Sequence, residues 1–237
     1  MCHNRSWTSS NEHESAIFAE RQSLAGTCQV IATNLTFEPD AAAVERSGLR
    51  SRLPEDYLYL LDRANGLYSH QYCLHILGIG VGVPAFHDIE RWNDSAGWRQ
   101  EYGDLVDNLV FFAETAFGDQ FYFDAELRVG KLLAETGYRT IIAETFSEWV
   151  DRLEVHAPEL LDLEVIEIWA GEQNRLAPGL HLCPQIPFCL GGAIDKPTDA
   201  YLGNSIEDMF FKGRLASQLK HVKPGEKVDL RAINLPP

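Results

Sequence analysis

The chain has 237 residues, with 35 Asp and Glu against 20 Lys and Arg, which gives a formal net charge of −15 at pH 7. A chain this acidic repels phosphate backbones, so the composition excludes the usual class of nucleic-acid-binding proteins, whose affinity comes from Lys and Arg. The hydrophobic content of 45% and charged content of 23% exclude wholesale disorder and are typical of a folded protein with a sizeable core.

The negative charge is concentrated in the middle of the chain. Residues 53–156 hold 18 acids and 7 bases, a net of −11, whereas residues 1–52 have a net of −1 and residues 157–237 a net of −3. A concentrated acidic surface keeps a protein soluble, and it can also steer a basic partner onto itself. Both interpretations are open from the charge alone.

Cysteine usage and hydropathy indicate the compartment. The cysteines are odd in number and scattered, which favours reduced thiols over a disulfide framework: Cys2, Cys28, Cys73, Cys183 and Cys189. The N-terminal residues lack the apolar core of a secretory signal, and no stretch reaches the roughly 18 apolar residues of a membrane span. We therefore expect a cytoplasmic protein that contacts neither membrane nor nucleic acid directly.

The clearest predicted helix follows Pro54. Glu55 and Asp56 fall in its first turn, Leu58, Leu60 and Leu61 follow, and Asn65-Gly66 closes it. Proline near the start, acids in the first turn and glycine after the end match the capping and dipole preferences of helices. Residues 15–24 and 40–46 could form two earlier helices.

The middle of the chain predicts a run of strands. They span residues 72–77, 109–113, 120–124, 128–133 and 139–143, and a helical segment is predicted over His87–Trp98. Thr145 and Glu148 form a capping-box pattern that opens a helix over Phe146–Leu153. Because the strands come in succession instead of alternating with crossover helices, we predict an α+β fold with a mostly antiparallel sheet packed by helices.

From Pro158 onward the chain changes character. Leu160–Trp169 fits either a strand or a helix, and Pro178–Gly192 is rich in Pro, Gly and Cys and is predicted to be irregular. Ser205–Val222 is predicted to be a helix, and Lys227–Ile233 alternates like an edge strand.

The glycine run Gly78-x-Gly80-x-Gly82 does not indicate a nucleotide site. Pro84 follows two residues later and no helix opens on the last glycine, so no helix N-terminus is available for a pyrophosphate. A turn at the end of a strand is favoured instead.

The sequence does not support a metal site or a pair of catalytic carboxylates. His181, Cys183 and Cys189 could form a metal site, but their spacing is not that of a zinc knuckle, and buried structural cysteines are favoured. Asp119 and Asp124 lie in or beside a strand turn and Glu114 precedes it, but the convergence of two carboxylates on one cleft does not follow from strand alternation. We therefore expect no catalytic residue, no metal site and no cofactor.

The segment Asp88–Asp107 has the character of an interface. It interleaves acids with aromatic residues, which resembles a protein-binding hot spot with an electrostatic rim. The alternative is that both tryptophans belong to the core and the acids are merely solvated. The predicted partner-binding residues are Glu90, Trp92, Asp94, Trp98, Glu101 and Asp104.

The motifs in their order resemble a known family. They are Leu53-Pro54-Glu55-Asp56-Tyr57, Leu60-Leu61, Asn65-Gly66, Phe112-Ala113, Gly118-Asp119, Phe121-Tyr122-Phe123-Asp124 and Thr145-Phe146-Ser147-Glu148-Trp149-Val150. Over residues 40–155 this string is similar to the Smi/Knr-type domain of the SUKH superfamily. The resemblance implies an α+β domain without enzymatic activity, in which Pro54, the Tyr57–Leu61 face and the Gly118-Asp119 turn are structural.

The resemblance also implies a function. Bacterial members of the superfamily are typically immunity proteins that bind and neutralise polymorphic toxins, often nucleases, and fungal relatives act as scaffolds. Our first hypothesis is an immunity protein whose acidic surface covers a basic nuclease toxin domain, and the second is a scaffold or regulatory adaptor. The third is a hydrolase or transferase near His181 and Cys183, which would require bound metal or a reactive thiol.

The extent of this resemblance divides the chain into three parts. Residues 1–39 are predicted to be an N-terminal extension, residues 40–156 the SUKH-like domain, and residues 157–237 a C-terminal extension packed on that domain.

Overall fold

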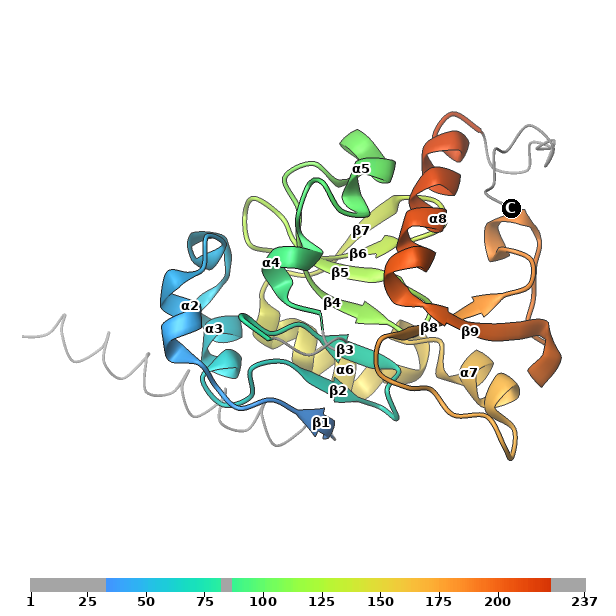
Figure 1. Ribbon diagram of the computed structural model, residues 1–237, viewed down its shortest axis with the longest axis horizontal. Helices are drawn as coiled ribbons and strands as arrows, with labels where there is room; N and C mark the ends of the chain where they lie inside the picture. Colours follow the sequence, from blue (N-terminus) through green and yellow to red (C-terminus); the bar gives the residue numbers. More distant parts are fainter. Residues whose placement is uncertain (1–32, 82–86, 223–237) are drawn as a thin grey trace, which may run out of the picture.

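The fold is built on one antiparallel sheet of seven strands in a computed structural model that describes residues 33–81 and 87–222 (Figure 1). Neighbouring strands in the sheet are neighbours in the chain, so the sheet is a meander. Its strands are β1 (Thr33–Thr36), β2 (Leu67–Ser69), β3 (Leu74–Ile76), β4 (Val110–Thr115), β5 (Gln120–Phe123), β6 (Val129–Leu133) and β7 (Tyr138–Ala143). Together with the helices, the sheet confirms the predicted α+β fold.

The described helices precede, interrupt and follow this sheet. They are α2 (Ala41–Arg46), α3 (Glu55–Leu61), α4 (Ile89–Trp92), α5 (Arg99–Tyr102), α6 (Phe146–Leu160), α7 (Leu163–Ala170) and α8 (Ser205–Leu219), with short 3-10 turns η1 (Arg50–Arg52), η2 (Gly103–Val106), η3 (Phe188–Leu190) and η4 (Pro197–Asp199). None of the helices described is long and apolar enough to cross a bilayer.

Most predicted elements are present, with differences at several places. The segment His87–Trp98 forms only the short α4, and α5 follows after a turn. Leu160–Trp169, for which strand and helix were both open, contains α7. The prediction of irregular structure over Pro178–Gly192 was wrong, because β8 (Leu180–Pro184) pairs there with β9 (Ala200–Asn204). The predictions for residues 15–24 and 227–233 lie outside the described residues.

One face of the sheet is covered by α3 and α6 through an aromatic core. Tyr57 of α3 meets the rings of Phe112 and Phe146 edge to face, at 5.6 and 5.3 Å between centroids. Trp149 of α6 packs edge to face on Phe112 at 5.1 Å. The Tyr57 hydroxyl donates to the carbonyl of Leu77 over 2.6 Å. The motif residue Tyr57 is therefore structural, as the sequence predicted.

The other face is covered by α4, α5 and the C-terminal elements. Trp98 packs on Phe111 of β4, with ring centroids 5.1 Å apart. Leu182 of β8 donates its backbone N–H to the carbonyl of Ala116 over 2.7 Å, which places the C-terminal hairpin at the β4–β5 turn. Figure 1 shows α8 alongside α5 and across the ends of the sheet strands.

Candidate functional site

The two tryptophans of the predicted interface belong to the core. Trp92 is 3% exposed and Trp98 is 2% exposed, so neither side chain offers a surface to a partner. The indole N–H of Trp92 donates to Oε1 of Gln120 on β5 over 2.8 Å. The predicted role of both residues as surface contacts is corrected, because Trp92 of α4 and Trp98, the N-cap residue of α5, are buried against the sheet.

The carboxylates Glu90 and Asp94 are exposed. Oε1 of Glu90 accepts from the Ser47 hydroxyl over 2.9 Å and from the Gly48 amide over 2.7 Å, while Asp94 caps the amide of Ala96 over 2.9 Å. Both side chains therefore make local hydrogen bonds at the protein surface, where a partner could also reach them.

Glu101 and Asp104 face the protein's own C-terminal helix. Arg214 of α8 lies 3.2 Å from Oε1 of Glu101, and Lys220, directly after α8, lies 2.5 Å from Oδ2 of Asp104. Part of the acidic segment is thus neutralised within the chain, so a partner would have to compete with α8 for these two carboxylates.

A second acidic surface lies beside α2 and α3. A groove of about 640 Å³ runs between α2, α3, the β5–β6 turn and the start of α6, and we call it the acidic groove. Arg50 is among its lining residues and pairs with Glu45 at 3.3 Å. The carboxylates that line it are Glu45, Glu55, Asp56, Asp62, Glu126 and Glu144.

A row of polar side chains crosses the sheet on its α8 face. Tyr68 of β2 stands opposite His75 of β3, His75 opposite Glu114 of β4, and Glu114 opposite Gln120 of β5. Nδ1 of His75 donates to Oε1 of Glu114 over 2.9 Å, and all four side chains are buried. Buried polar groups of this kind require partners, and here the partners come from the C-terminal elements.

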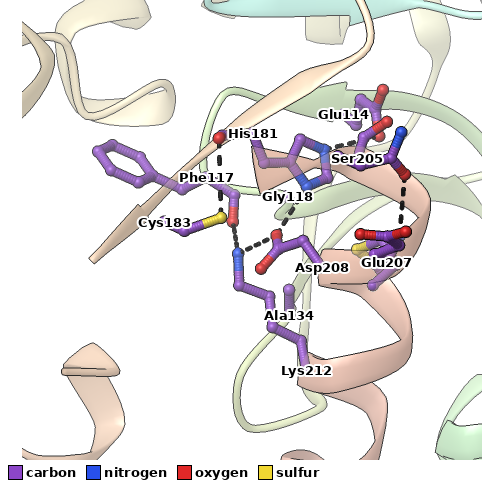
Figure 2. A network of polar contacts seen from close by, with 12 residues as sticks. Glu114, Phe117, Gly118, Ala134, His181, Cys183, Ser205, Glu207, Asp208 and Lys212 are labelled. Atoms are coloured by element: carbon purple, nitrogen blue, oxygen red, sulfur yellow. Dashed lines mark hydrogen bonds and ion pairs between the residues drawn. The ribbon is translucent and has the colours of Figure 1, made fainter. Parts of the chain in front are cut away.

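Figure 2 shows how those elements complete the row. His181 of β8 donates from Nε2 to Oε2 of Glu114 over 3.1 Å and from Nδ1 to Oδ2 of Asp208 over 2.7 Å. Nζ of Lys212, one turn further along α8, donates to the same oxygen of Asp208 over 2.6 Å and to the carbonyl of Phe117. We call these residues, together with His75 and His87, the buried network.

His87, which precedes α4, reaches the same place. Its Nε2 lies 2.7 Å from Oγ of Ser205 and 3.7 Å from Oε1 of Glu114. Donor atoms of His75, His87 and Glu114 all lie within 4.8 Å of one another, and among the described residues these form the one group with metal-ligand geometry. For His181, Cys183 and Cys189, whose spacing disfavours a metal site, no such group is found among the described residues.

Burial and charge pairing divide the network into neutral and charged members. Burial lowers the pKa of His75 and lowers that of His87 to about 4, so both imidazoles are neutral at pH 7. Burial would raise the pKa of Glu114, but His181 outweighs it and holds that pKa well below its usual value. Burial would likewise raise the pKa of Asp208, yet Lys212 and His181 lower it to about 2.

The three described cysteines do not supply a reactive thiol. Burial raises the pKa of Cys73, Cys183 and Cys189 to about 12 in each case. A thiolate is the nucleophilic form, so these three thiols are inert at neutral pH. The thiol variant of the third hypothesis was therefore wrong for the described cysteines.

The sequence contained a partial signal for the buried network. His75 and Glu114 each stand in an otherwise apolar strand, and Asp208 and Lys212 are spaced for one face of a helix. No local pattern indicates that these residues meet, because they lie on β3, β4, β8 and α8.

The comparisons with known proteins agree with this fold. Residues 42–152 match the model of the SMI1 / KNR4 family (SUKH-1). A solved structure, that of Atu4351 from Agrobacterium tumefaciens, superposes with a TM-score of 0.51 at 14% sequence identity, over 77% of this chain and 84% of that chain. At this identity the likeness shows the fold alone. No curated protein matches the chain. The motifs, the sheet and the family match together identify residues 42–152 as a SUKH-superfamily domain of the SMI1/KNR4 type.

Proposed function

We propose that the protein is a non-enzymatic binding protein that neutralises a cognate toxin domain by stoichiometric binding. The SUKH superfamily includes immunity proteins, which supports this class of function. The observation that carries the proposal is the acidic groove, where six carboxylates surround a concave surface of the SUKH domain. A concave acidic surface is complementary to the basic surface with which a nuclease domain binds nucleic acid.

The mechanism is occlusion. Carboxylates of the groove attract the basic domain and raise the association rate, and the walls contributed by Leu58, Tyr59 and Leu127 add contact area once it is seated. Glu90 and Asp94 are exposed and remain proposed partner contacts, whereas Glu101 and Asp104 contribute less because α8 already pairs with them.

A direct test is co-expression with a toxin domain encoded beside the protein. Rescue of growth and a complex in size-exclusion chromatography are expected. Failure of both would overturn the proposal. Charge reversal then locates the surface: Asp62→Lys with Glu144→Lys, two exposed groove positions, should weaken binding at least roughly tenfold, mainly through the association rate. Glu154→Lys with Glu172→Lys, equally exposed but outside the groove lining, changes the net charge by the same amount and is the matched control.

The salt dependence separates this function from a scaffold. Steering by charge predicts association rates that fall steeply as ionic strength rises. A complex whose formation is indifferent to salt would favour a scaffold or adaptor with an apolar interface.

A further inference from the structure

We propose that His75, His87 and Glu114 form a binding site for a divalent transition-metal ion of the Zn²⁺ class at the centre of the buried network. The proposal departs from the sequence-based expectation of no metal site, and it is independent of the partner-binding function.

Three side chains from separate segments of the chain converge at this place. The three residues come from β3, from the segment before α4 and from β4, yet one nitrogen or oxygen of each lies within 4.8 Å of the others. His75 is 2% exposed, Glu114 is 3% exposed and His87 is 8% exposed. Two imidazoles and a carboxylate are the ligand set of many three-residue zinc sites, which leave a fourth position for water.

Both imidazole rings are fixed in orientation by aromatic neighbours. The His75 ring stacks on Tyr68 with centroids 4.1 Å apart and planes at 10°. The His87 ring stacks on Trp92 at 4.2 Å and 19°, and the Trp92 indole is itself held by Gln120. Ligands that are oriented before the ion arrives lose little rotational freedom on binding it.

A second layer of hydrogen bonds holds the Glu114 carboxylate in place. Oε1 of Glu114 faces the two imidazoles, while its other oxygen, Oε2, accepts from His181. His181 is oriented in turn by Asp208, and Asp208 by Lys212. Hydrogen-bonded chains behind a ligating carboxylate or histidine are the usual way in which proteins fix the geometry of a metal ligand.

The donor types narrow the ion. Imidazole nitrogen suits Zn²⁺, Cu²⁺, Ni²⁺ and Fe²⁺, whereas Mg²⁺ and Ca²⁺ prefer sites made of oxygen. The described thiols of Cys73, Cys183 and Cys189 are not in the group, which disfavours a soft Cu⁺ site.

The test uses the full chain, produced without a polyhistidine tag. Metal content is measured after purification, and the protein is then freed of metal by prolonged dialysis against a chelator, because buried ligands exchange slowly. Titration with Co²⁺ should give about one equivalent with the visible absorption of four-coordinate Co²⁺, and Zn²⁺ should displace it and raise the thermal midpoint. If chelation unfolds the protein, refolding by Zn²⁺ but not by Mg²⁺ supports the site equally.

Variants assign the ligands. His87→Phe keeps the stacking on Trp92 and is expected to abolish stoichiometric binding, whereas His156→Phe, at an exposed histidine, is the matched control. His181→Gln should keep the stoichiometry and weaken affinity roughly 10- to 100-fold, as loss of an outer contact does. The proposal is overturned if the wild-type protein takes up neither ion, or if His87→Phe binds as tightly as the wild type. Either result would make the cluster a hydrogen-bonded network only.

Discussion

His181 donates to Glu114 over 3.1 Å and thereby joins the C-terminal hairpin to the central sheet, 67 residues away in the chain. The carboxylate is buried and ionised, so it depends on this donor for the stability of its charge. The family domain and the C-terminal elements therefore share one polar core.

Lys212→Met should destabilise the protein by about 3 kcal/mol, because the buried carboxylate of Asp208 loses its lysine partner and is left with His181. Adding Asp208→Asn removes that charge and keeps an oxygen facing His181, so the double variant should recover part of the loss. Lys220→Met, at the exposed pair with Asp104, is the control and should cost less than about 1 kcal/mol. Urea unfolding of the wild type and the three variants measures these differences, and equal losses for Lys212→Met and Lys220→Met would contradict the account.

Asp208 should make the protein sensitive to acid. Its pKa is about 2 in the folded protein against 3.8 ordinarily, so its stabilising effect is complete above about pH 4 and is lost as the pH falls toward 2. That effect amounts to about 2 kcal/mol. The groups that face Asp208 are Lys212, His181 and Cys183. The pKa of each is raised above its ordinary value, so none of them changes its charge between pH 4 and pH 2.

The free energy of unfolding of wild type and Asp208→Asn, measured from pH 7 to pH 2, checks this prediction. The difference between the two proteins should be constant down to about pH 4 and shrink below it. Glu114 also has a lowered pKa and is present in both proteins, so the comparison reports the change at Asp208 together with its effect on the shared donor His181. A difference that stays constant to pH 2 would show that Asp208 does not carry the effect.

Gly118→Ala should disturb the network through the turn that the family motif contains. Gly118 has a φ of +76°, and a Cβ there would lie 2.9 Å from the His181 ring and 3.2 Å from Oδ2 of Asp208. Gly191→Ala is a matched control, since φ is +90° but nothing lies within 4 Å of the added carbon. Both variants should lose about 1–2 kcal/mol from backbone strain, and only Gly118→Ala should lose more. Thermal or urea unfolding reports the excess, and its absence would mean that the turn yields without displacing His181.

The thiols of Cys73, Cys183 and Cys189 should resist modification in the native state. A pKa of about 12 lowers the thiolate fraction at pH 8 by a factor of roughly a thousand or more relative to a free cysteine. The measurement is a disulfide-exchange assay on the Cys2→Ser, Cys28→Ser variant, which retains only these three. Slow reaction in the native protein and rapid reaction of three thiols in denaturant are expected, whereas a fast native phase would disprove the assignment.

Local sequence patterns predicted the fold well because strands that pair in the sheet are also consecutive in the chain. The sheet is a meander whose strands follow one another, so alternation and turn residues such as Gly118-Asp119 suffice to locate them. Asp119 behaves as the motif implies, since its Oδ1 accepts from the amide of Ala134 over 2.9 Å. The strand β8 was missed because its proline and cysteine content favours a loop, and pairing with β9 overrides that preference.

The candidate sites were harder to predict because they depend on contacts between distant segments. Trp92 lies in a helix of four residues and Trp98 caps another of the same length, and such helices are too short for the sequence to show which side faces the sheet. The same charge pattern that suggested an external partner for Glu101 and Asp104 serves an internal one, α8. For the acidic groove, its six carboxylates come from four separate segments, and only the fold brings them together.

The shared polar core also bears on where this protein could be cut. A fragment ending with α6 would contain everything that the family match recognises, yet it would present Glu114, Gln120 and His75 to solvent on a face shaped for burial. Removing β8, β9 and α8 strips Glu114 of its charged donor and strips the β4–β5 turn of its cover. We therefore expect the unit that folds cooperatively to extend beyond the residues of the family match and to include the C-terminal hairpin and helix.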